Sequence, residues 1–172
     1  MKIHSTPDAR LAELGKLIAG FKVAMLTNTG DNGELESRPM AALEMDATGA
    51  LWFFTDLRSA KVEHLRVANL SFSDADNGTY VSLSGHGQIV LDRDHIKALW
   101  TPFAKPWFPE GPESPDLVLL KFVPHNAEYW DAPHSKMVRM AAMAASIVAG
   151  KPVGLGAHDR LSGLSNGARP PG

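Results

Sequence analysis

The stretch FFTDLRSAK, residues 53–61, carries the side chains with the clearest chemical potential, because an apolar run gives way at once to hydroxyl and basic groups. Thr55 and Ser59 carry hydroxyls, and Lys61 carries an ammonium group. If a strand ends here and a helix begins at Ser59, the free N–H groups of the first helical turn point beyond the strand, which suits a phosphate. The stretch thus predicts an anion site. An ordinary N-cap at Ser59 beside a solvated Arg58 and Lys61 also fits the spacing, and capping serines are common.

A second basic side chain, Arg38, lies within the otherwise apolar strand predicted for residues 35–45. Pro39 removes one backbone N–H from this strand, which makes it an edge or a bulge where a ligand can approach the backbone. In hairpin order this strand neighbours the strand of the first stretch. Arg38 therefore predicts a second contact to the same anion, and a salt bridge to Glu36 or Glu44 is the structural alternative.

The common motifs of nucleotide, metal and nucleophile chemistry are absent from the sequence. There is no GxxxxGK[ST], and the glycine pairs at 85–87 and 154–156 do not complete GxGxxG after a strand. The seven histidines show neither HExxH nor ligand-pair spacing, and no serine lies in a nucleophile elbow. These absences disfavour a P-loop enzyme, a Rossmann fold and a metal site. His86 and His134 remain candidate proton donors, for the sole reason that histidine titrates near neutral pH.

Composition narrows the class of protein further. The chain has 172 residues, of which 44% are hydrophobic, so a single domain with a proper core is expected. The net charge is −2 with both signs interspersed, which argues against nucleic-acid and membrane-surface partners. The sequence has no cysteine and no apolar run long enough for a membrane span. We therefore expect a cytoplasmic protein whose partners are small molecules or protein.

Most of the elements that must position these residues are predicted to be strands. Apolar residues at helical spacing predict an opening helix over 7–21, with Thr6 as N-cap and Pro7 in the first turn. Short Gly, Asn and Asp clusters between apolar runs are typical of antiparallel hairpins. The strands are expected at 22–29, 35–45, 50–55, 70–73, 80–92, 117–124 and 126–132, with short helices at 59–68 and 95–100 and a Pro-rich loop at 101–115.

Hairpin order without regular strand–helix alternation favours a small antiparallel barrel over a doubly wound parallel sheet. Residues 1–149 are expected to form one domain with flanking helices, of which the last is Ala- and Met-rich and spans 135–150. The stretch 150–172 is rich in Gly and Pro and is expected to be a poorly ordered tail.

Four motifs, in this order, resemble the pyridoxamine 5′-phosphate oxidase-like flavoproteins, and especially their general stress protein 26 branch. They are SRPM, LWFFTDLRSAKVEHL, YVSLSGHGQIVLD and AEYWD, and the similarity extends over residues 8–133. The most specific parts are the strand-end block 54–61 and the segment WFPEGPESPDLVLLKFVPHNAEYWD. The resemblance implies a mainly β protein with an antiparallel split β-barrel. It also implies a homodimer with one FMN in each of two clefts at the subunit interface.

The resemblance also implies roles for individual residues. Arg38 and Lys61 would bind the FMN phosphate with support from Ser59, and the isoalloxazine ring would lie along the backbone at Met40 and Ala41. The residues expected to contact the cofactor are Arg38, Pro39, Met40, Ala41, Phe54, Thr55, Ser59, Lys61, Tyr80, Trp107, Phe108 and Trp130.

Four aromatic residues in this set have more particular roles. Tyr80 stands where the oxidase has a glutamine from the partner subunit, and Trp130 matches a tryptophan that contacts the flavin. Trp107 and Phe108, on the Pro-rich loop, are expected to cover the ring from the other subunit. Closure of the barrel mouth or of the dimer seam is an equal alternative for these two, because aromatic side chains dominate interfaces.

Two departures from the oxidase pattern bear on activity. Ala60 stands where the oxidase has an arginine beside its phosphate-binding lysine, and the Arg-Leu-His motif that engages the oxidase substrate does not follow Trp130. We therefore expect a flavin binder that is not a competent pyridoxamine 5′-phosphate oxidase. Its substrate is an unknown small molecule, and FAD is a possible alternative to FMN.

Three functions fit this interpretation. The first is an FMN-dependent oxidoreductase, and the second is a non-catalytic flavin-binding protein for storage or redox sensing. The third is a cleft for haem or a deazaflavin, because a fold does not fix a function. The sequence positions no histidine for haem, and the joint presence of Arg38, Thr55, Ser59 and Lys61 disfavours an empty cleft.

Overall fold

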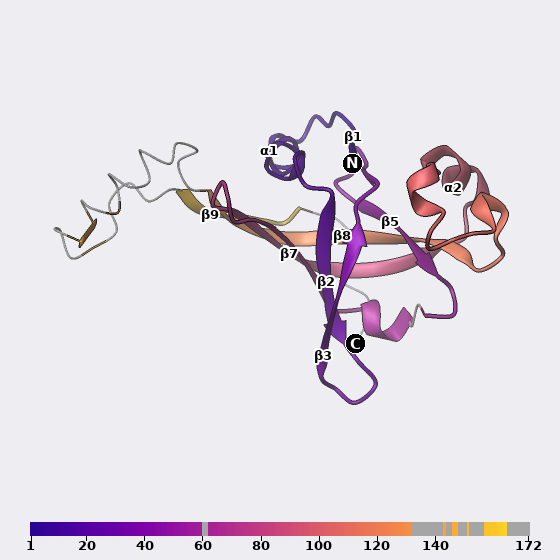
Figure 1. Ribbon diagram of the computed structural model, residues 1–172. Coiled ribbons are helices and arrows are strands. Elements are labelled where there is room, and N and C mark those ends of the chain that lie inside the picture. Colours follow the sequence, from indigo (N-terminus) through magenta and orange to yellow (C-terminus); the bar gives the residue numbers. More distant parts are fainter. Residues whose placement is uncertain (60–61, 132–142, 144–145, 148–150, 152–156, 165–172) are drawn as a thin grey trace.

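The computed structural model describes residues 1–59, 62–131, 143, 146, 147, 151 and 157–164 (Figure 1). The strands are β1 (Lys2–Ile3), β2 (Val23–Thr29), β3 (Leu35–Ala41), β4 (Glu44–Met45), β5 (Leu51–Asp56), β6 (Ala68–Asp74), β7 (Thr79–Val90), β8 (Leu117–Asp131) and β9 (Ala157–Ser162). The helices are α1 (Ala9–Ile18) and α2 (Arg93–Leu99), and the 3-10 turns are η1 (Val62–Leu65), η2 (Pro102–Ala104) and η3 (Gly111–Glu113). The mainly β class that the sequence predicts is confirmed.

Helix α1 lies against the barrel strands because one of its faces is apolar (Figure 1). Leu11, Leu14 and Ile18 recur at helical spacing and are buried in the core. The helix begins later than the sequence predicts, and its N-cap is Asp8 instead of Thr6. The reason is that the Asp8 carboxylate accepts two backbone N–H groups of the first turn.

The strands form one sheet in the order β1-β4-β5-β8-β7-β6-β2-β3, and β9 pairs with β8. Strand β8 is central, because β7 pairs with nearly all of it on one side. On the other side, β5 pairs with Leu117–Phe122 and β9 pairs with Asn126–Asp131. The sequence predicts two strands over 117–132, and the structure has one. A bulge opposite Ser84 and Gly85 absorbs His125 without ending the strand.

The C-terminal part of the chain differs from its sequence prediction in one respect. No strand is predicted for residues 157–162, and the structure pairs them with β8. The predicted helix over 135–150 lies almost entirely outside the described residues. The division of the chain at residue 149 stays a prediction.

The two ends of the sheet meet where the chain passes from β3 to β4. Strand β3 pairs with β2, whereas β4, two residues further on, pairs with β5. At this passage the Ala42 N–H donates to the Lys22 carbonyl, and the Leu43 N–H donates to the Trp52 carbonyl. The sheet thus curls into a barrel that is joined at Ala42 and Leu43 and is open between β3 and β5, which do not pair.

Buried side chains lie on both faces of the curled sheet. The interior group, which includes Leu26, Phe53 and Phe122, fills the barrel. A second group on the outer face of β5 and β8, built around Trp52 and Leu119, is covered by α2. One face of each strand thus points into the barrel, and the outer face of β5 and β8 points toward α2. The predicted site residues can be placed by the face on which they lie.

Candidate functional site

A small polar cavity of about 90 Å³ lies at the open end of the barrel, where the chain leaves β2, enters β3 and leaves β5. Its lining comes from five segments of the chain, and every member is polar or charged. The lining residues are Asn28, Asp31, Glu36, Arg38, Ser59 and His64. The structure therefore brings together two of the residues that the sequence predicts for an anion site, Arg38 and Ser59.

The register of β2 and β3 explains why Arg38 faces this cavity. Arg38 pairs with Leu26, and Met40 pairs with Ala24. Leu26 and Ala24 are buried inside the barrel, so both of their partners lie on the same interior face. Arg38 is half-buried, and no described residue forms an ion pair or a hydrogen bond with it. Neither Glu36 nor Glu44 neutralises it, so the predicted salt-bridge alternative does not occur.

Other groups in the cavity carry the opposite charge or an unused acceptor. His64 Nε2 lies 3.1 Å from Asp31 Oδ1, and Glu36 lies over Gly30. Asn28 is 2% exposed, and its Oδ1 has no hydrogen-bond partner in the described part of the chain. A buried carbonyl oxygen without a donor is costly. The cavity therefore suits a ligand that presents an anionic group to Arg38 and a hydrogen-bond donor to Asn28.

The strand-end stretch behaves differently from its sequence prediction. The Ser59 hydroxyl donates to the Asp56 carbonyl at 3.0 Å, and the predicted N-cap at Ser59 stays a prediction because residues 60 and 61 lie outside the described part of the chain. The predicted helix over 59–68 is reduced to the single 3-10 turn η1. Thr55 pairs with Val118 and faces the barrel interior. Lys61 lies outside the described residues, so its role stays a prediction.

Arg58 is already neutralised within the protein. Its guanidinium donates to Asp56 at 3.0 and 2.7 Å and lies 3.5 Å from Asp116. The hydrogen bonds from Arg58 hold the pKa of Asp56 below its ordinary value, and the same pairing raises the pKa of Arg58. Arg58 is therefore a structural residue at this end of β5, and the anion site has to rely on other cations.

Five of the predicted residues lie on the opposite, outer face of the sheet, and one of them is Phe54, which packs under α2. Pro39 and Ala41 alternate with Arg38 and Met40 along β3, so they point outward. Tyr80 and Trp130 are direct partners on β7 and β8, and each is 42% exposed. The Trp130 ring also stacks on His158 of β9, with ring centroids 4.8 Å apart and an interplanar angle of 15°.

The remaining aromatic residues separate into a packed pair and an exposed one. Phe108 lies edge-on to Phe54 with centroids 6.1 Å apart, and Trp100 packs on Phe54 at 5.8 Å. Phe108 thus has a packing partner within its own chain. Trp107 is 75% exposed and contacts none of the other predicted site residues through a ring interaction among the described residues.

The structure adds residues that sequence reasoning missed. Asn28 could have been found from the sequence, because it alternates with Ala24 and Leu26 and therefore falls on the buried face of a strand. His64 and Asp31 had no signal, since they meet only after the barrel curls. His158 had none either, because no strand is predicted there.

A buried histidine on β7, His86, pairs with a half-buried one on β8, His125, outside this cavity. His86 Nδ1 is 2.9 Å from His125 Nε2, and Gln88 Nε2 is 3.0 Å from His86 Nε2. Burial and the neighbouring His125 lower the pKa of His86. His86 thus favours the neutral imidazole, and the sequence does not indicate its pairing with His125. Within the described residues, no group of three or more histidine or carboxylate side chains could hold a metal ion.

Among the described residues, no helix has the length and apolar character needed to span a bilayer.

Comparisons with known proteins give a consistent result. Residues 9–153 match the family model described as pyridoxamine 5′-phosphate oxidase like. The protein bli-3 of Neurospora crassa is 28% identical over 158 residues, which cover 84% of this chain and 76% of that protein.

Solved structures share the fold. A candidate general stress protein 26 from Jannaschia sp. CCS1 superposes with a TM-score of 0.68 at 24% identity, over 88% of this chain and 96% of that chain. The general stress FMN/FAD binding protein of Xanthomonas citri superposes with a TM-score of 0.60 at 29% identity, over 72% of this chain and 89% of that chain.

Proposed function

The chain belongs to the pyridoxamine 5′-phosphate oxidase-like family and shares its split β-barrel fold, and from this premise we propose that it is a flavin-binding protein of the general stress type that holds FMN. Flavin binding is the function that the cavity and the relatives support together. The FMN preference, the dimer and the oxidoreductase activity described below are parts of the same proposal.

The observation that carries the proposal is the placement of Arg38 and Ser59 in one cavity. Its volume of about 90 Å³ is well below the roughly 300–1,000 Å³ of clefts that hold a whole drug-sized ligand, so it suits a phosphate group better than a ring system. Arg38 would donate to the phosphate oxygens. The polyol chain of FMN carries hydroxyl donors next to its phosphate, and such a donor would satisfy the buried Asn28 Oδ1.

The ring end of FMN would lie along the open edge of the barrel. Strand β3 has a ladder partner on one side only, and Pro39 lacks the N–H that a further strand would need. The backbone at Met40 and Ala41 is therefore free to line a flat ring, with Thr55 across the opening on β5. Phe54 packs on the outer face of β5 against Trp100 and Phe108, so Thr55 is the member of this pair that faces the opening.

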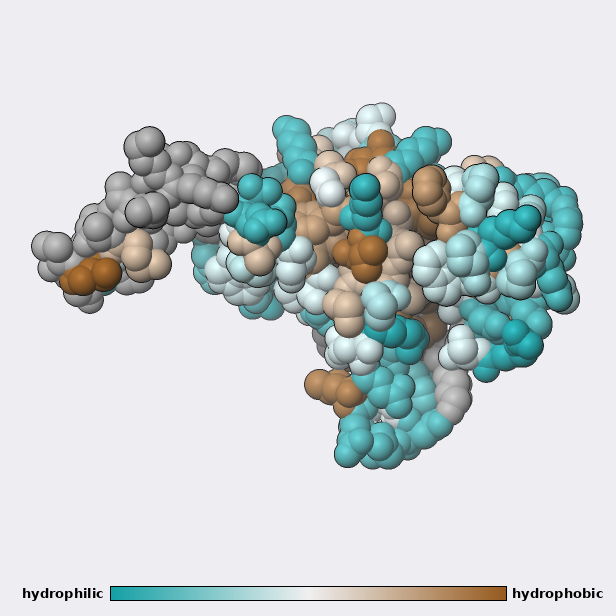
Figure 2. All heavy atoms as spheres, viewed as in Figure 1, coloured by the Kyte–Doolittle hydropathy of each residue, from teal (hydrophilic) through white to brown (hydrophobic). Residues whose placement is uncertain are grey.

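We propose that a second copy of the chain completes the site. Val23, Met25, Tyr80 and Trp130 are 40–50% exposed and lie on the same outer face of the sheet. In Figure 2 hydrophilic side chains gather over α2 and at the β2–β3 hairpin, whereas hydrophobic ones gather over the strands in the middle of the view. Exposed apolar side chains on one sheet face favour association, and a homodimer would bring Tyr80 and Trp130 toward the flavin.

The proposed activity is that of an FMN-dependent oxidoreductase acting on an unknown small molecule. The flavin supplies the electron chemistry, and the residues of this chain bind it, orient it and exclude water from it. Ala60 and the absence of Arg-Leu-His after Trp130 support a substrate other than pyridoxamine 5′-phosphate.

The test begins with an absorption spectrum of the purified protein and fluorescence titrations with FMN, FAD and riboflavin. The expected result is quenching that saturates at one FMN per chain, with weaker binding of riboflavin because it has no phosphate. Absence of binding to all three would overturn the proposal, and a Soret band would point to haem.

Turnover is tested on the FMN-loaded protein. Reduction by a nicotinamide donor, followed by reoxidation that a small organic acceptor accelerates above the rate in air, is the expected behaviour of an oxidoreductase. Reoxidation that no acceptor accelerates would support the storage or sensing function instead.

A further inference from the structure

The polar cavity at the open end of the barrel contains one side chain whose charge changes near neutral pH. His64 lines this cavity together with Arg38 and Ser59. A histidine titrates near neutral pH, whereas an arginine keeps its charge and carboxylates ionise at much lower pH. Among the described lining residues, only His64 can therefore make the binding of an anion depend on pH near neutrality.

The 3-10 turn η1 holds His64 at this position. Leu65, the next residue, is 1% exposed and belongs to the barrel core. A Cβ placed at Gly87 of β7 would come within 3.1 Å of the Leu65 Cβ, so the turn lies directly on the sheet. The His64 side chain itself is only 18% exposed. Its ring is therefore part of the cavity wall and not a solvated side chain at the surface.

Asp31 decides which nitrogen of His64 carries the hydrogen. His64 Nε2 lies 3.1 Å from Asp31 Oδ1. An ionised carboxylate only accepts hydrogen bonds, so the hydrogen of a neutral His64 ring is on Nε2, and Nδ1 has none. His64 forms no other hydrogen bond or ion pair with the described residues. A phosphate can therefore receive a hydrogen bond from Nδ1 only when the ring takes up a second proton.

The charges inside the cavity decide how easily His64 takes up that proton. Asp31 and Glu36 favour the protonated ring, and Arg38 opposes it. An incoming phosphate brings negative charge into the same cavity of about 90 Å³, so it shifts the balance toward the protonated ring. Binding of a phosphate and protonation of His64 thus favour each other.

The charged groups outside the cavity do not take the place of His64. Strand β2 carries no charged residue, and Arg66, two residues after His64, is exposed. On β7, which lies against η1, His86 alternates with Gly87 and therefore points to the other face of the sheet. Neither Arg66 nor His86 lines the cavity. His64 is thus the histidine that a ligand there would meet.

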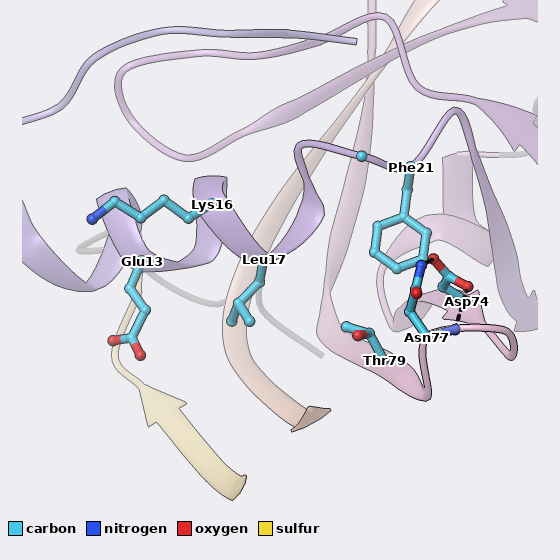
Figure 3. A pocket seen from close by; sticks show the side chains of 8 residues that line it. Glu13, Lys16, Leu17, Phe21, Asp74, Asn77 and Thr79 are labelled. Atoms are coloured by element: carbon cyan, nitrogen blue, oxygen red, sulfur yellow. Dashed lines mark hydrogen bonds between the residues drawn. The ribbon is translucent and has the colours of Figure 1, made fainter. Parts of the chain in front are cut away.

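A larger cavity, of about 370 Å³, lies between α1 and the β6–β7 hairpin and is another place where an anion could bind (Figure 3). Lys16 is the only cation among its described lining residues, and its ammonium leads away from Phe21 and Asp74 (Figure 3). The described lining contains no histidine. An anion bound there would take up no proton near neutral pH, so proton uptake distinguishes the two cavities.

We propose that His64, as an imidazolium, holds the flavin phosphate together with Arg38 and Ser59, and that FMN binding therefore takes up a proton. The inference rests on the proposed flavin function and adds a regulation of its site. The protonated fraction of a histidine falls as the pH rises, so the affinity for FMN falls as the pH rises through neutrality. The protein is thus expected to retain FMN better at pH 7 than at pH 8.5.

Isothermal titration calorimetry of the full chain with FMN counts the protons. The titration is done at pH 7.5 in two buffers of different ionisation enthalpy, Tris and MOPS, at the same salt concentration. At this pH the FMN phosphate is already a dianion, because the second pKa of a phosphate monoester is about 6. If the bound phosphate favours the protonated ring about tenfold, as a hydrogen bond to a charged group does, about 0.4 proton per FMN is taken up. Riboflavin has no phosphate and is expected to take up none.

The pH profile identifies the histidine. For the same tenfold preference, the FMN affinity of the wild-type protein is expected to fall about threefold between pH 7 and pH 8.5. His64→Gln is expected to bind FMN more weakly at pH 7, with no proton uptake and no fall in affinity over this range. The matched control is His4→Gln, at a histidine that pairs with Glu44 and lines no part of the cavity. This control should keep both the proton uptake and the threefold fall.

The outcomes separate this inference from the proposed function. FMN binding without proton uptake in the wild-type protein would overturn the role of His64 and leave the flavin function intact, and this result needs no variant. Proton uptake that persists in His64→Gln would overturn its assignment to this residue. A loss of affinity in His64→Gln that is equal for FMN and riboflavin at every pH would reduce His64 to a structural role. Absence of binding to both flavins would overturn the flavin function as well.

Discussion

At the scale of single residues, Arg38 and Arg58 show how burial and pairing separate a binding cation from a structural one. Both are close to the open end of the barrel, Arg38 within β3 and Arg58 just after the end of β5. Arg58 uses its guanidinium on Asp56 and Asp116, while Arg38 faces the polar cavity without an ion pair among the described residues. Only Arg38 therefore has its hydrogen-bonding capacity free for a ligand.

Substitution of Arg38 tests its role at the phosphate. Arg38→Gln is expected to lower the affinity for FMN by about 1.5–3 kcal/mol, the range for a hydrogen bond to a charged group, and to leave riboflavin binding almost unchanged. Fluorescence titration with both flavins measures the difference, and Arg58→Gln is the control with no effect on either. Equal losses for FMN and riboflavin would place Arg38 away from the phosphate.

His86 gives the protein a pH-dependent stability. Its pKa in the folded protein is lowered by burial and by His125, so the unfolded chain takes up a proton at a higher pH than the folded one. His86 then makes its full contribution to the free energy of unfolding at a pH above the ordinary histidine pKa, near 6.5. This contribution is lost as the pH drops below that value. Urea unfolding between pH 7.5 and 5.5 is expected to show this loss.

The histidine responsible can be identified by substitution. His86→Gln should reduce the dependence of unfolding free energy on pH, whereas His158→Gln, at an exposed position of β9, should keep it. If both variants retain the full dependence, another group causes it.

At the scale of elements, the bulge between β7 and β8 depends on a residue without a side chain. A Cβ added at Gly85 would collide with the Val123 carbonyl oxygen and come within 2.8 Å of the Phe122 ring. Gly85→Ala is therefore expected to destabilise the protein by at least about 1–3 kcal/mol, as overpacking does. Urea unfolding measures it, and Gly20→Ala is the control, because a Cβ there meets nothing within 4 Å. Equal stability of the two variants would contradict the close approach of the strands.

The elements also show how far sequence can predict this fold. Alternation in β2 and helical spacing in α1 are local signals, and both elements are confirmed. The single strand β8 was missed because Pro124 and His125 look like a turn, and only the partner strand β7 shows that they form a bulge. The helix predicted over 59–68 is a shorter 3-10 turn, Val62–Leu65, because strand β6 already begins at Ala68.

The part of the candidate site that comes from strands adjacent in the sequence could be predicted. Hairpin order places Arg38 near the end of β5, and the structure brings Arg38 and Ser59 to one cavity. Alternation along a strand shows which residues share a face of the sheet, as it does for Asn28, but it does not show which distant segments meet once the barrel curls. That is why Asp31 was not expected in the cavity, whereas the sequence indicates Glu36 as a neighbour of Arg38. Tyr80 and Trp130 lie on the face of the sheet opposite Arg38.

At the scale of the whole molecule, the proposed homodimer can be tested on the outer face of the sheet. Met25 is 40% exposed on that face, and Met25→Glu should place a charge within the proposed interface. We expect the protein to sediment as a dimer, and the variant to sediment as a monomer with weaker FMN binding. The control is Leu91→Glu, at a residue that is 66% exposed but lies in the turn before α2. A wild-type protein that is monomeric at micromolar concentration would contradict the proposed interface.

The central place of β8 has a consequence for the order in which the protein can fold during synthesis. Strands β5 and β7 are joined in the sheet only through β8, which is made from residues 117–131. Until that segment leaves the ribosome, both strands keep an open edge, and such edges recruit other chains. The barrel therefore closes only after about three quarters of the sequence has been translated, and a nascent chain stalled before residue 117 carries two unprotected strands that a chaperone has to shield.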